Sequence, residues 1–392
     1  MMMILRRTYI AVIVLVLLPF MAVAQAFDTR AKAAYVLDQT TSTVLLSKNA
    51  DTPLPPASMS KLMTIYMAFE AVSDGRLEIT EKLLVSQHAM DYAGSTMFLK
   101  AGERVSVEDL LRGVIVLSGN DASAVLAEAL SRDGSEAGFA RMMTTRAREM
   151  GMMNSTFANS NGWPAAGHRM SMKDLGILAS RLIADYPTYY PLFSQREFMF
   201  DGRAPANSQN RNPVLGLGIG ADGLKTGHTS EAGYGLVGSA KQGDRRIVFV
   251  ITGLDTARER AEEAEKIVNW AFRQFAQKDV VRAGTKLAQA NVWMGDQPTV
   301  GLTVAQDLSM LVPVLGTQDG INAEVVFDQP ITAPITAGQP LGELVVTFDG
   351  LPELRLPLVA DRDVATGGFG VKIRTAATVL WDRFVPKPGG AV

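Results

Sequence analysis

The chain of 392 residues contains no cysteine, only three histidines and little net charge, −2 at pH 7. Without cysteine there is no disulfide framework, no thiolate nucleophile and no lipid-modified cysteine. His88, His168 and His228 do not form a His-Glu-x-x-His pattern, so the sequence argues against a zinc hydrolase. The near-neutral charge gives no electrostatic basis for binding nucleic acid.

The residues that are present predict a folded, exported protein of two domains. Hydrophobic residues make up 47% of the chain and charged residues 20%, as in ordinary globular proteins. Arg6 and Arg7 precede an apolar run from Tyr9 to Phe20, and small residues end at Ala26. This pattern predicts a signal peptide over residues 1–26, with an uncleaved anchor as the alternative. We therefore expect the mature chain to work outside the cytoplasm.

The patterns between residues 27 and 276 predict one α+β domain. Short β-type runs at 33–38 and 43–47 open it, and a second hairpin over 235–240 and 246–253 precedes a closing helix over 261–275. Helical patterns lie between the hairpins; one begins near Ser58, and the others cover 106–117, 121–130, 136–150 and 171–184. This order is typical of an α+β domain.

After residue 277 short β-type runs alternate with Gly, Pro and Asp turns, which predicts a small all-β domain over 277–360. Residues 361–392 are expected to form a linker and a helix. Within 370–384 the apolar residues recur at helical spacing, and the other face is basic. Such a helix either packs on its own domain or lies in a membrane surface, and its terminal position and basic face favour the membrane.

The helix that begins near Ser58 carries the first candidate for chemistry. A serine hydroxyl is a poor nucleophile unless a base removes its proton. Lys61 lies one helical turn from Ser58, and it can be that base if burial or a second cation lowers its pKa from about 10.4. The same tetrad also occurs on solvated helix faces, so Ser58-x-x-Lys61 alone is weak support.

Two later motifs strengthen this interpretation. Ser118-Gly119-Asn120 lies in a turn between two helical patterns, where Ser118 can relay a proton and Asn120 can hold Lys61 or a substrate amide. In Lys225-Thr226-Gly227, the lysine can be the second cation that lowers the pKa of Lys61 and attracts a substrate carboxylate. Gly227 allows a bound peptide to approach a strand edge closely. Taken singly, these motifs are also typical of a helix cap and a turn.

In this order, the three motifs resemble those of the penicillin-binding proteins of the D-alanyl-D-alanine carboxypeptidase family, the low-molecular-mass type within the serine β-lactamase and transpeptidase superfamily. The residues at 97–100, 117–122 and 222–227 are also similar to that family's local sequences. The resemblance implies an antiparallel sheet with a helical cluster, then a small all-β domain and a C-terminal amphipathic helix.

The resemblance also implies a role for each site residue. Ser58 would be the acylated nucleophile and Lys61 its base, with Ser118 and Asn120 as the second pair and Lys225, Thr226 and Gly227 as the substrate-side strand. The oxyanion hole would use the backbone N–H groups of Ser58 and His228. Arg260 would help to hold the substrate carboxylate, although Arg258 is only two residues away, and His168 either borders the cleft or is structural.

The function implied is that of a serine D-Ala-D-Ala carboxypeptidase that trims peptidoglycan stem pentapeptides and is acylated by β-lactams. It would need no cofactor and would act at the periplasmic face of the inner membrane, held there by its C-terminal helix. A DD-endopeptidase, a β-lactamase and a non-catalytic wall-binding protein are the alternatives. A class A β-lactamase carries a Glu-x-x-Leu-Asn pentad between the second and third motifs. None of the glutamates in that interval of this chain, at 128, 136, 149 and 197, opens such a pentad.

Overall fold

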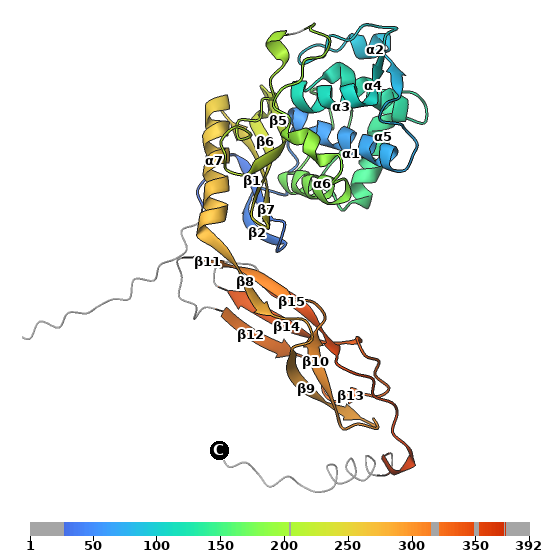
Figure 1. Ribbon diagram of the computed structural model, residues 1–392, viewed down its shortest axis with the longest axis vertical. Coiled ribbons are helices and arrows are strands. Elements are labelled where there is room, and N and C mark those ends of the chain that lie inside the picture. The colour runs from blue at the N-terminus through green and yellow to red at the C-terminus, as the bar shows by residue number, and fades with distance from the viewer. Residues whose placement is uncertain (1–26, 204, 315–320, 349–352, 372, 374–392) are drawn as a thin grey trace, which may run out of the picture.

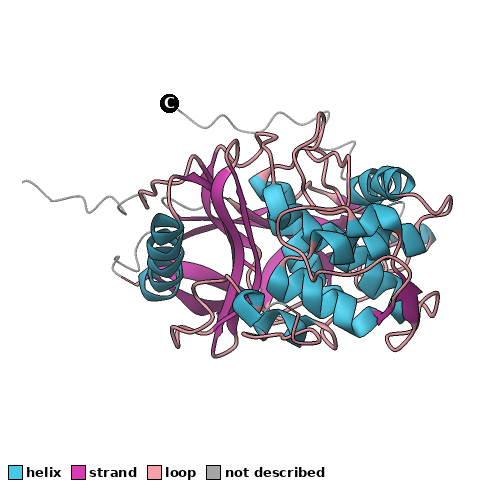
Figure 2. Cartoon of the chain, turned by 90° about the horizontal axis from the view of Figure 1, so that it is seen from above, coloured by secondary structure: helices cyan, strands magenta, loops and turns pink. Residues whose placement is uncertain are grey.

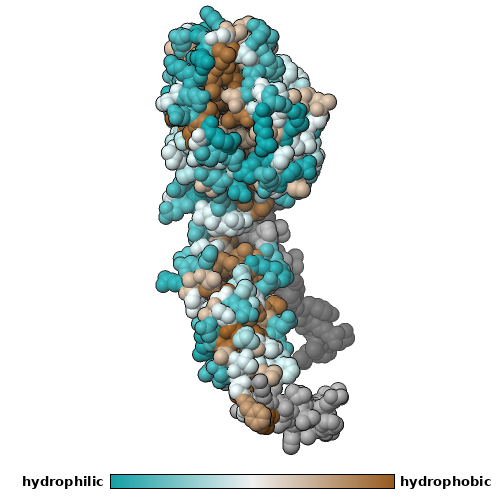
Figure 3. All heavy atoms as spheres, turned by 90° about the vertical axis from the view of Figure 1, so that its right-hand side faces the viewer, coloured by the Kyte–Doolittle hydropathy of each residue, from teal (hydrophilic) through white to brown (hydrophobic). Residues whose placement is uncertain are grey.

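The computed structural model describes residues 27–203, 205–314, 321–348, 353–371 and 373, and it contains two domains arranged end to end (Figure 1). Helix α7 (Ala257–Gln274) ends the upper domain and continues directly into strand β8 (Phe275–Val281) of the lower one. A narrow waist separates the two domains in the space-filling view (Figure 3). The boundary predicted between residues 276 and 277 falls inside β8.

A five-stranded antiparallel sheet forms the middle of the upper domain. Its order is β2-β1-β7-β6-β5, and the strands are β1 (Ala33–Asp38), β2 (Thr43–Lys48), β5 (Ala221–Thr229), β6 (Gly233–Gln242) and β7 (Arg245–Leu254). Both predicted hairpins are present. The resemblance implied a strand at Lys225, Thr226 and Gly227, but the sequence pattern did not mark β5 as a strand, because ADGLKTGHT contains Gly, Asp and Lys, which are rare in strands. Its pairing with β6 overrides that propensity.

The sheet separates two hydrophobic cores. Helix α7 covers one face and buries Ala264, Ile267, Val268 and Ala271 against it. The helical cluster covers the other face, as the view from above shows (Figure 2). The central helix of this cluster, α1 (Lys61–Ser73), is buried at every position from Lys61 to Phe69 rather than on one face alone. Lys61 is therefore held inside the domain.

Most of the other predicted helices begin within a residue of the expected positions, because their sequences carry clear caps, but α7 begins at Ala257 rather than at 261. Ser106, Ser135, Ser171 and Thr256 each accept a hydrogen bond from the backbone N–H three residues later. Helix α3 (Val107–Arg112) continues as a π-helical turn to Leu117. The other predicted helices are α4 (Asn120–Leu130), α5 (Glu136–Glu149) and α6 (Met172–Asp185). Helix α2 (Gln87–Met90) was not predicted, nor were β3 (Lys82–Leu84) and β4 (Arg104–Ser106), which flank it in the chain and pair antiparallel.

The lower domain is all β, as predicted. Its main sheet has the order β12-β14-β15-β10-β9-β13, and β8 pairs separately with β11. Alternate residues such as Val300, Leu302, Leu344 and Leu358 form its core. The strands are β9 (Lys286–Trp293), β10 (Thr299–Val304), β11 (Leu308–Pro313), β12 (Ile321–Val326), β13 (Ile331–Thr332), β14 (Pro340–Phe348) and β15 (Leu354–Ala360).

Two predicted segments lie outside the described residues, namely the signal peptide and nearly all of the amphipathic helix over 370–384. Within the described residues, no helix has both the length and the apolar character needed to cross a membrane.

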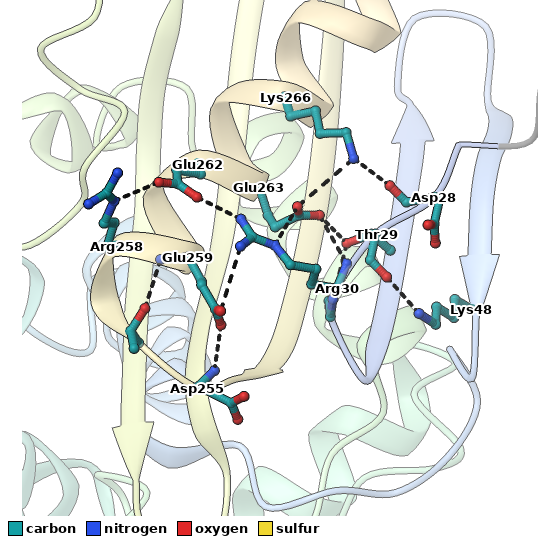
Figure 4. A network of polar contacts seen from close by, with 12 residues as sticks. Asp28, Thr29, Arg30, Lys48, Asp255, Arg258, Glu259, Glu262, Glu263 and Lys266 are labelled. Atoms are coloured by element: carbon teal, nitrogen blue, oxygen red, sulfur yellow. Dashed lines mark hydrogen bonds and ion pairs between the residues drawn. The ribbon is translucent and has the colours of Figure 1, made fainter.

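Polar contacts attach the start of the described chain to α7 (Figure 4). The carboxylate of Glu263, which is buried, accepts hydrogen bonds from Thr29 Oγ1 at 2.6 Å and from Arg30 Nε at 3.2 Å. Lys266 Nζ donates to the Asp28 carbonyl at 2.7 Å. These contacts fix the N-terminal segment beside the helix that leads to the lower domain.

Candidate active site

The Ser58 side chain lies in a single 3-10 turn, Ala57–Ser60, that leads into α1. Within this turn Ser58 is partly exposed, whereas Ala57, Met59 and Ser60 are buried. Ala57 adopts φ +49°, a left-handed conformation that is costly for a residue with a Cβ atom. The turn thus presents one hydroxyl at the surface of a packed domain.

Two glycines allow other segments to pack tightly on this turn. A Cβ atom on Gly162 would collide with the Ala57 carbonyl, and Gly162 has φ +81°. A Cβ atom on Gly227 would lie 3.0 Å from both the Met59 side chain and the Pro56 carbonyl oxygen. A larger residue at 227 would force these neighbours to move by a few tenths of an ångström, so glycine favours the close approach of β5 to the Ala57–Ser60 turn, a reason that the sequence did not reveal. The outer edge of β5 has no described strand beside it.

The Lys61 amine is buried and its nitrogen reaches three oxygen atoms. Lys61 Nζ lies 3.0 Å from Ser58 Oγ, 2.7 Å from Asn120 Oδ1 and 2.6 Å from the carbonyl oxygen of Asn161. A neutral amine has two N–H groups and one lone pair. It can therefore donate to Asn120 and Asn161 and still accept the proton of Ser58.

The surroundings of Lys61 favour this neutral form. Burial is the main cause and the positive charge of Arg211 the second, and together they lower the pKa of Lys61 to about 7. The carboxylates of Asp121 and Glu136 oppose this shift. Arg211 is thus a further cation beside the predicted Lys225, and the repulsion between Lys61 and Lys225 adds to burial in lowering the pKa of Lys225.

Ser118 and Lys225 form a second buried pair. Lys225 Nζ donates to Ser118 Oγ at 2.9 Å and to the Thr226 carbonyl at 3.2 Å. Burial is the main cause that lowers the pKa of Lys225 well below its usual value, followed by the charges of Lys61, Arg211 and Arg260. Ser118 itself adopts φ +63°, and this left-handed conformation turns the chain between the π-helical turn and α4.

Asn120 is oriented by a further contact. Its Nδ2 donates to the Ala93 carbonyl at 2.7 Å, which leaves Oδ1 facing Lys61. The next residue, Asp121, is buried and accepts hydrogen bonds from the backbone N–H groups of Met97 and Leu99. The Met97–Lys100 segment and the second motif are thus physically linked.

Arg211 is the site residue that sequence reasoning missed. It lies in the loop before β5, where its guanidinium donates to Ser95 Oγ at 2.7 Å and to Asn207 Oδ1 at 2.9 Å. Arg260 is buried nearby and donates to the Arg211 carbonyl at 3.3 Å. No spacing rule identifies a single arginine in a loop rich in Gly and Asn, so only the fold reveals that Arg211 joins the predicted Lys225 and Arg260.

The remaining predicted residues occupy distinct environments. Arg258 is 88% exposed and pairs with Glu262, whereas Arg260 lies over the ring of Tyr234. His228 is exposed and stacks on the ring of Tyr234, with 3.9 Å between the ring centroids. Thr226 is buried beside Lys225.

His168 is buried behind the Ser58 turn. Its Nδ1 accepts a hydrogen bond from the backbone N–H of Ala158 at 3.2 Å. Burial is the main cause, with the charges of Lys61 and Arg169, that lowers the pKa of His168 to about 4. A neutral ring with this contact fits a packing role better than proton transfer.

Taken together, the turn, the loop and the strand edge form a site suited to acyl transfer. A partly exposed hydroxyl faces a buried amine of lowered pKa, and a second hydroxyl–amine pair lies beside it. Cations surround both pairs, so a substrate that carries a carboxylate would be attracted. Nucleophile, base and a proton relay are the parts that such a reaction requires.

Comparisons with known proteins give a consistent result. A family model described as D-alanyl-D-alanine carboxypeptidase matches residues 20–256, and one described as penicillin-binding protein 5, C-terminal domain, matches residues 275–366. The D-alanyl-D-alanine carboxypeptidase DacF of Bacillus subtilis is 33% identical over 86% of this chain and 87% of its own length.

Solved structures agree with these sequence matches. Penicillin-binding protein 5 from Haemophilus influenzae has a TM-score of 0.76 and 32% identity, over 86% of this chain and 98% of that one. Penicillin-binding protein D2 from Listeria monocytogenes, solved in its ampicillin-bound form, has a TM-score of 0.54 and 33% identity, over 63% of this chain and 98% of that one.

Proposed function

The chain belongs to the D-alanyl-D-alanine carboxypeptidase family, and we propose that it removes the terminal D-alanine from peptidoglycan stem pentapeptides through an acyl-enzyme on Ser58. Membership makes it a serine carboxypeptidase of the penicillin-binding type. The observation that carries the residue assignment is the Lys61 amine, buried, of lowered pKa and 3.0 Å from Ser58 Oγ.

In the proposed acylation step, neutral Lys61 takes the proton of Ser58 as Oγ attacks the carbonyl carbon between the two D-alanines. The backbone N–H groups of Ser58 and His228 would stabilise the oxyanion. The C–N bond then breaks, and the leaving amine receives its proton through Ser118. Water afterwards cleaves the ester and releases the shortened peptide.

The cations have a separate role in this proposal. Lys225, Arg211 and Arg260 lie on the side of the site formed by β5 and α7, and none of the three forms an ion pair with a described carboxylate. A terminal D-alanine carboxylate would complement the two guanidinium charges and would favour the charged form of Lys225, whose pKa is lowered in the free site. The substrate backbone would pair with the open edge of β5 along Thr226 and Gly227.

We extend the same proposal to β-lactams, since the Listeria protein was solved with ampicillin bound. A β-lactam would acylate Ser58. Because no glutamate opens a Glu-x-x-Leu-Asn pentad here, the penicilloyl ester should last for minutes or longer while the pentapeptide turns over repeatedly.

The test is labelling with a fluorescent penicillin, followed by mass spectrometry of the adduct and of the products from linear and cross-linked muropeptides. Labelling of Ser58 with release of D-alanine from the linear pentapeptide supports the proposal. Rapid multiple turnover of penicillin would favour a β-lactamase, cleavage of cross-links an endopeptidase, and absence of both labelling and hydrolysis a wall-binding protein.

We also propose that the chain is exported by residues 1–26 and works at the periplasmic face of the inner membrane, where its tail binds the membrane surface. The signal-peptide pattern and the amphipathic pattern of the tail support this proposal. In it, residues 27–276 form the catalytic domain, residues 277–360 the β-rich domain and residues 361–392 the linker and anchor. Deleting the residues after Asp363 should release the protein from membranes and leave hydrolysis of a soluble peptide unchanged. Continued sedimentation with membranes would overturn the anchor assignment.

A further inference from the structure

Glu136 is a buried carboxylate that the proposed reaction does not use. It is the first residue of α5, directly after the cap Ser135, and only 7% of its surface is exposed. A buried charge is costly unless hydrogen bonds satisfy it. Both oxygen atoms of Glu136 are satisfied by residues from other segments.

The contacts of Glu136 lead to the loop beside Lys61. One oxygen, Oε1, accepts hydrogen bonds from the backbone N–H of Ser160 at 2.9 Å and from Ser160 Oγ at 2.5 Å. The other, Oε2, accepts from Tyr92 Oη at 2.6 Å and lies 2.8 Å from His88 Nε2. Glu136 therefore fixes Ser160 at two atoms and is itself held from the opposite side.

Ser160 in turn positions the main chain that contacts the base. Its carbonyl oxygen accepts a hydrogen bond from Thr64 Oγ1 at 2.6 Å, one turn along α1 from Lys61. The next carbonyl, of Asn161, is the one that accepts from Lys61 Nζ at 2.6 Å. The loop is closed by Asn159, whose Oδ1 accepts from the N–H of Gly162 at 2.8 Å.

We propose that Glu136 is a positioning residue: through Ser160 it holds the Asn161 carbonyl against the Lys61 amine and so keeps that amine in line with Ser58. The proposal rests on the function proposed above for Ser58 and Lys61. If the Asn161 carbonyl moves, Lys61 loses one of the two acceptors that fix its lone pair toward the nucleophile. Glu136 itself touches neither Ser58 nor Lys61 through any described hydrogen bond.

Charge gives this role a measurable signature. The carboxylate of Glu136 is one of the groups that raise the pKa of Lys61 and so oppose its burial. Its removal should therefore lower that pKa further, and the neutral base should persist to lower pH. The other charged or titratable groups around Lys61 are Asp121, His168, Arg211 and Lys225, and those around Glu136 are His88, Tyr92 and Glu128.

The test compares Glu136→Gln with Glu136→Ala in the full chain, by the rate of acylation with a fluorescent penicillin across pH. Glutamine keeps the shape and the acceptor toward Ser160 but removes the charge. The acid limb of the pH profile, where the acylation rate falls because Lys61 gains a proton, should therefore move to lower pH by about half a pH unit or more. Alanine removes both, so the plateau rate should also fall about 10-fold or more. Glu149→Gln on the exposed end of α5 is the control and should leave both unchanged.

Rates are expressed per labelled molecule, so that a variant which merely unfolds in part changes the labelled fraction and not the rate. The proposal is overturned if both Glu136 variants keep the wild-type plateau and acid limb, or if only the labelled fraction falls. If Glu136→Ala does not fold, Ser160→Ala decides, because it removes the Oγ contact to Glu136 and keeps the charge: its plateau rate should fall while the acid limb stays in place, and an unchanged plateau would overturn the proposal. Absence of labelling in the wild-type protein would instead refute the proposed function.

Discussion

Buried cations occur in two kinds of environment in the upper domain. Arg245 is buried and its Nε donates to Asp38, whose side chain is fully buried, while its other nitrogens donate to the carbonyls of Ala271 and Phe275. Lys61 and Lys225 are buried as well, but their amines contact only hydroxyl, amide and carbonyl oxygens among the described residues.

The two environments give the buried cations different roles: Arg245 stabilises the fold, and Lys61 takes part in the proposed reaction. A carboxylate partner keeps a buried cation charged and fixes the segments on either side, here β1, β7 and the end of α7. Neutral oxygens satisfy the hydrogen bonds of an amine but do not compensate its charge, so burial lowers its pKa and it becomes a base. Arg245 thus holds the junction between the domains, and Lys61 is free to react.

The largest expected effect comes from removing the reactive amine. Lys61→Ala should slow acylation by penicillin about 10²–10⁴-fold, because no other described group contacts Ser58 Oγ as a base. The measurement is the rate of covalent labelling at pH 8, with circular dichroism to show that the fold is kept. Ser58→Ala should abolish labelling altogether, and full labelling of either variant would contradict the assignment.

The lowered pKa of Lys61 should also make the free energy of unfolding depend on pH. The folded pKa of Lys61, about 7, lies below its unfolded value of about 10.4. Between these values the unfolded chain holds the proton and the folded one does not, so raising the pH favours the folded state. Relative to Lys61→Met, the wild-type free energy of unfolding should rise by about 1.4 kcal/mol per pH unit from pH 7 to 10. Equal slopes in urea titrations would show that Lys61 is charged in the folded protein.

Breaking the structural pair should instead affect stability. Arg245→Met leaves Asp38 buried without its cation, which should cost about 3–5 kcal/mol in the free energy of unfolding. Arg355→Met removes an exposed arginine that pairs with Glu343 and Glu353, and its cost should be far smaller, because solvent screens exposed ion pairs. Urea denaturation measures both. Acylation by the folded fraction should remain normal in each variant, and similar costs would show that burial of the pair does not matter.

Replacing Arg211 should change the pKa of Lys61 without removing Lys61 itself. The positive charge of Arg211 lowers the pKa of Lys61, so Arg211→Gln should raise that pKa and move the acid limb of acylation to higher pH. At pH 7 the rate should fall about 5–10-fold, because less of Lys61 is neutral. Arg211→Lys keeps the charge and should keep the limb. A limb that stays in place in Arg211→Gln would show that this charge does not reach Lys61.

The sequence predicted those parts of the molecule that local patterns determine. The helix caps at Ser106 and Ser171 and the alternation in the lower domain led to the right elements, and the resemblance named the three motifs that the fold brings together. The local pattern did not mark β5 as a strand, because its pairing with β6 and not its composition makes it one, and only the resemblance implied it. Arg211 and Glu136 were not assigned to the site because both are distant from Lys61 in the sequence, and only the folded chain brings their charges near it. Nothing in the sequence around either residue indicates that its charge lies close to Lys61 in the folded chain.

The smallest expected effect tests the same contrast within one network, where Arg30 faces both a buried and an exposed carboxylate (Figure 4). Glu263 is 3% exposed, accepts from Thr29 and Arg30, and has a lowered pKa despite burial, because these hydrogen bonds favour the charged form. Glu262 is 44% exposed and lies 2.7 Å from the same guanidinium. Glu263→Gln should therefore cost about 1 kcal/mol, and Glu262→Gln nearly nothing.

The pH dependence of stability distinguishes a charge effect at Glu263 from a packing effect. Because its folded pKa is below the unfolded value of about 4.3, the stabilisation is present above pH 4.3 and is lost as the pH falls toward the folded pKa. The difference between wild type and Glu263→Gln in urea titrations should accordingly shrink from pH 6 to pH 3. If the difference stays constant, shape rather than charge stabilises this contact, and a buried carboxylate beside an arginine would be no different here from a neutral amide.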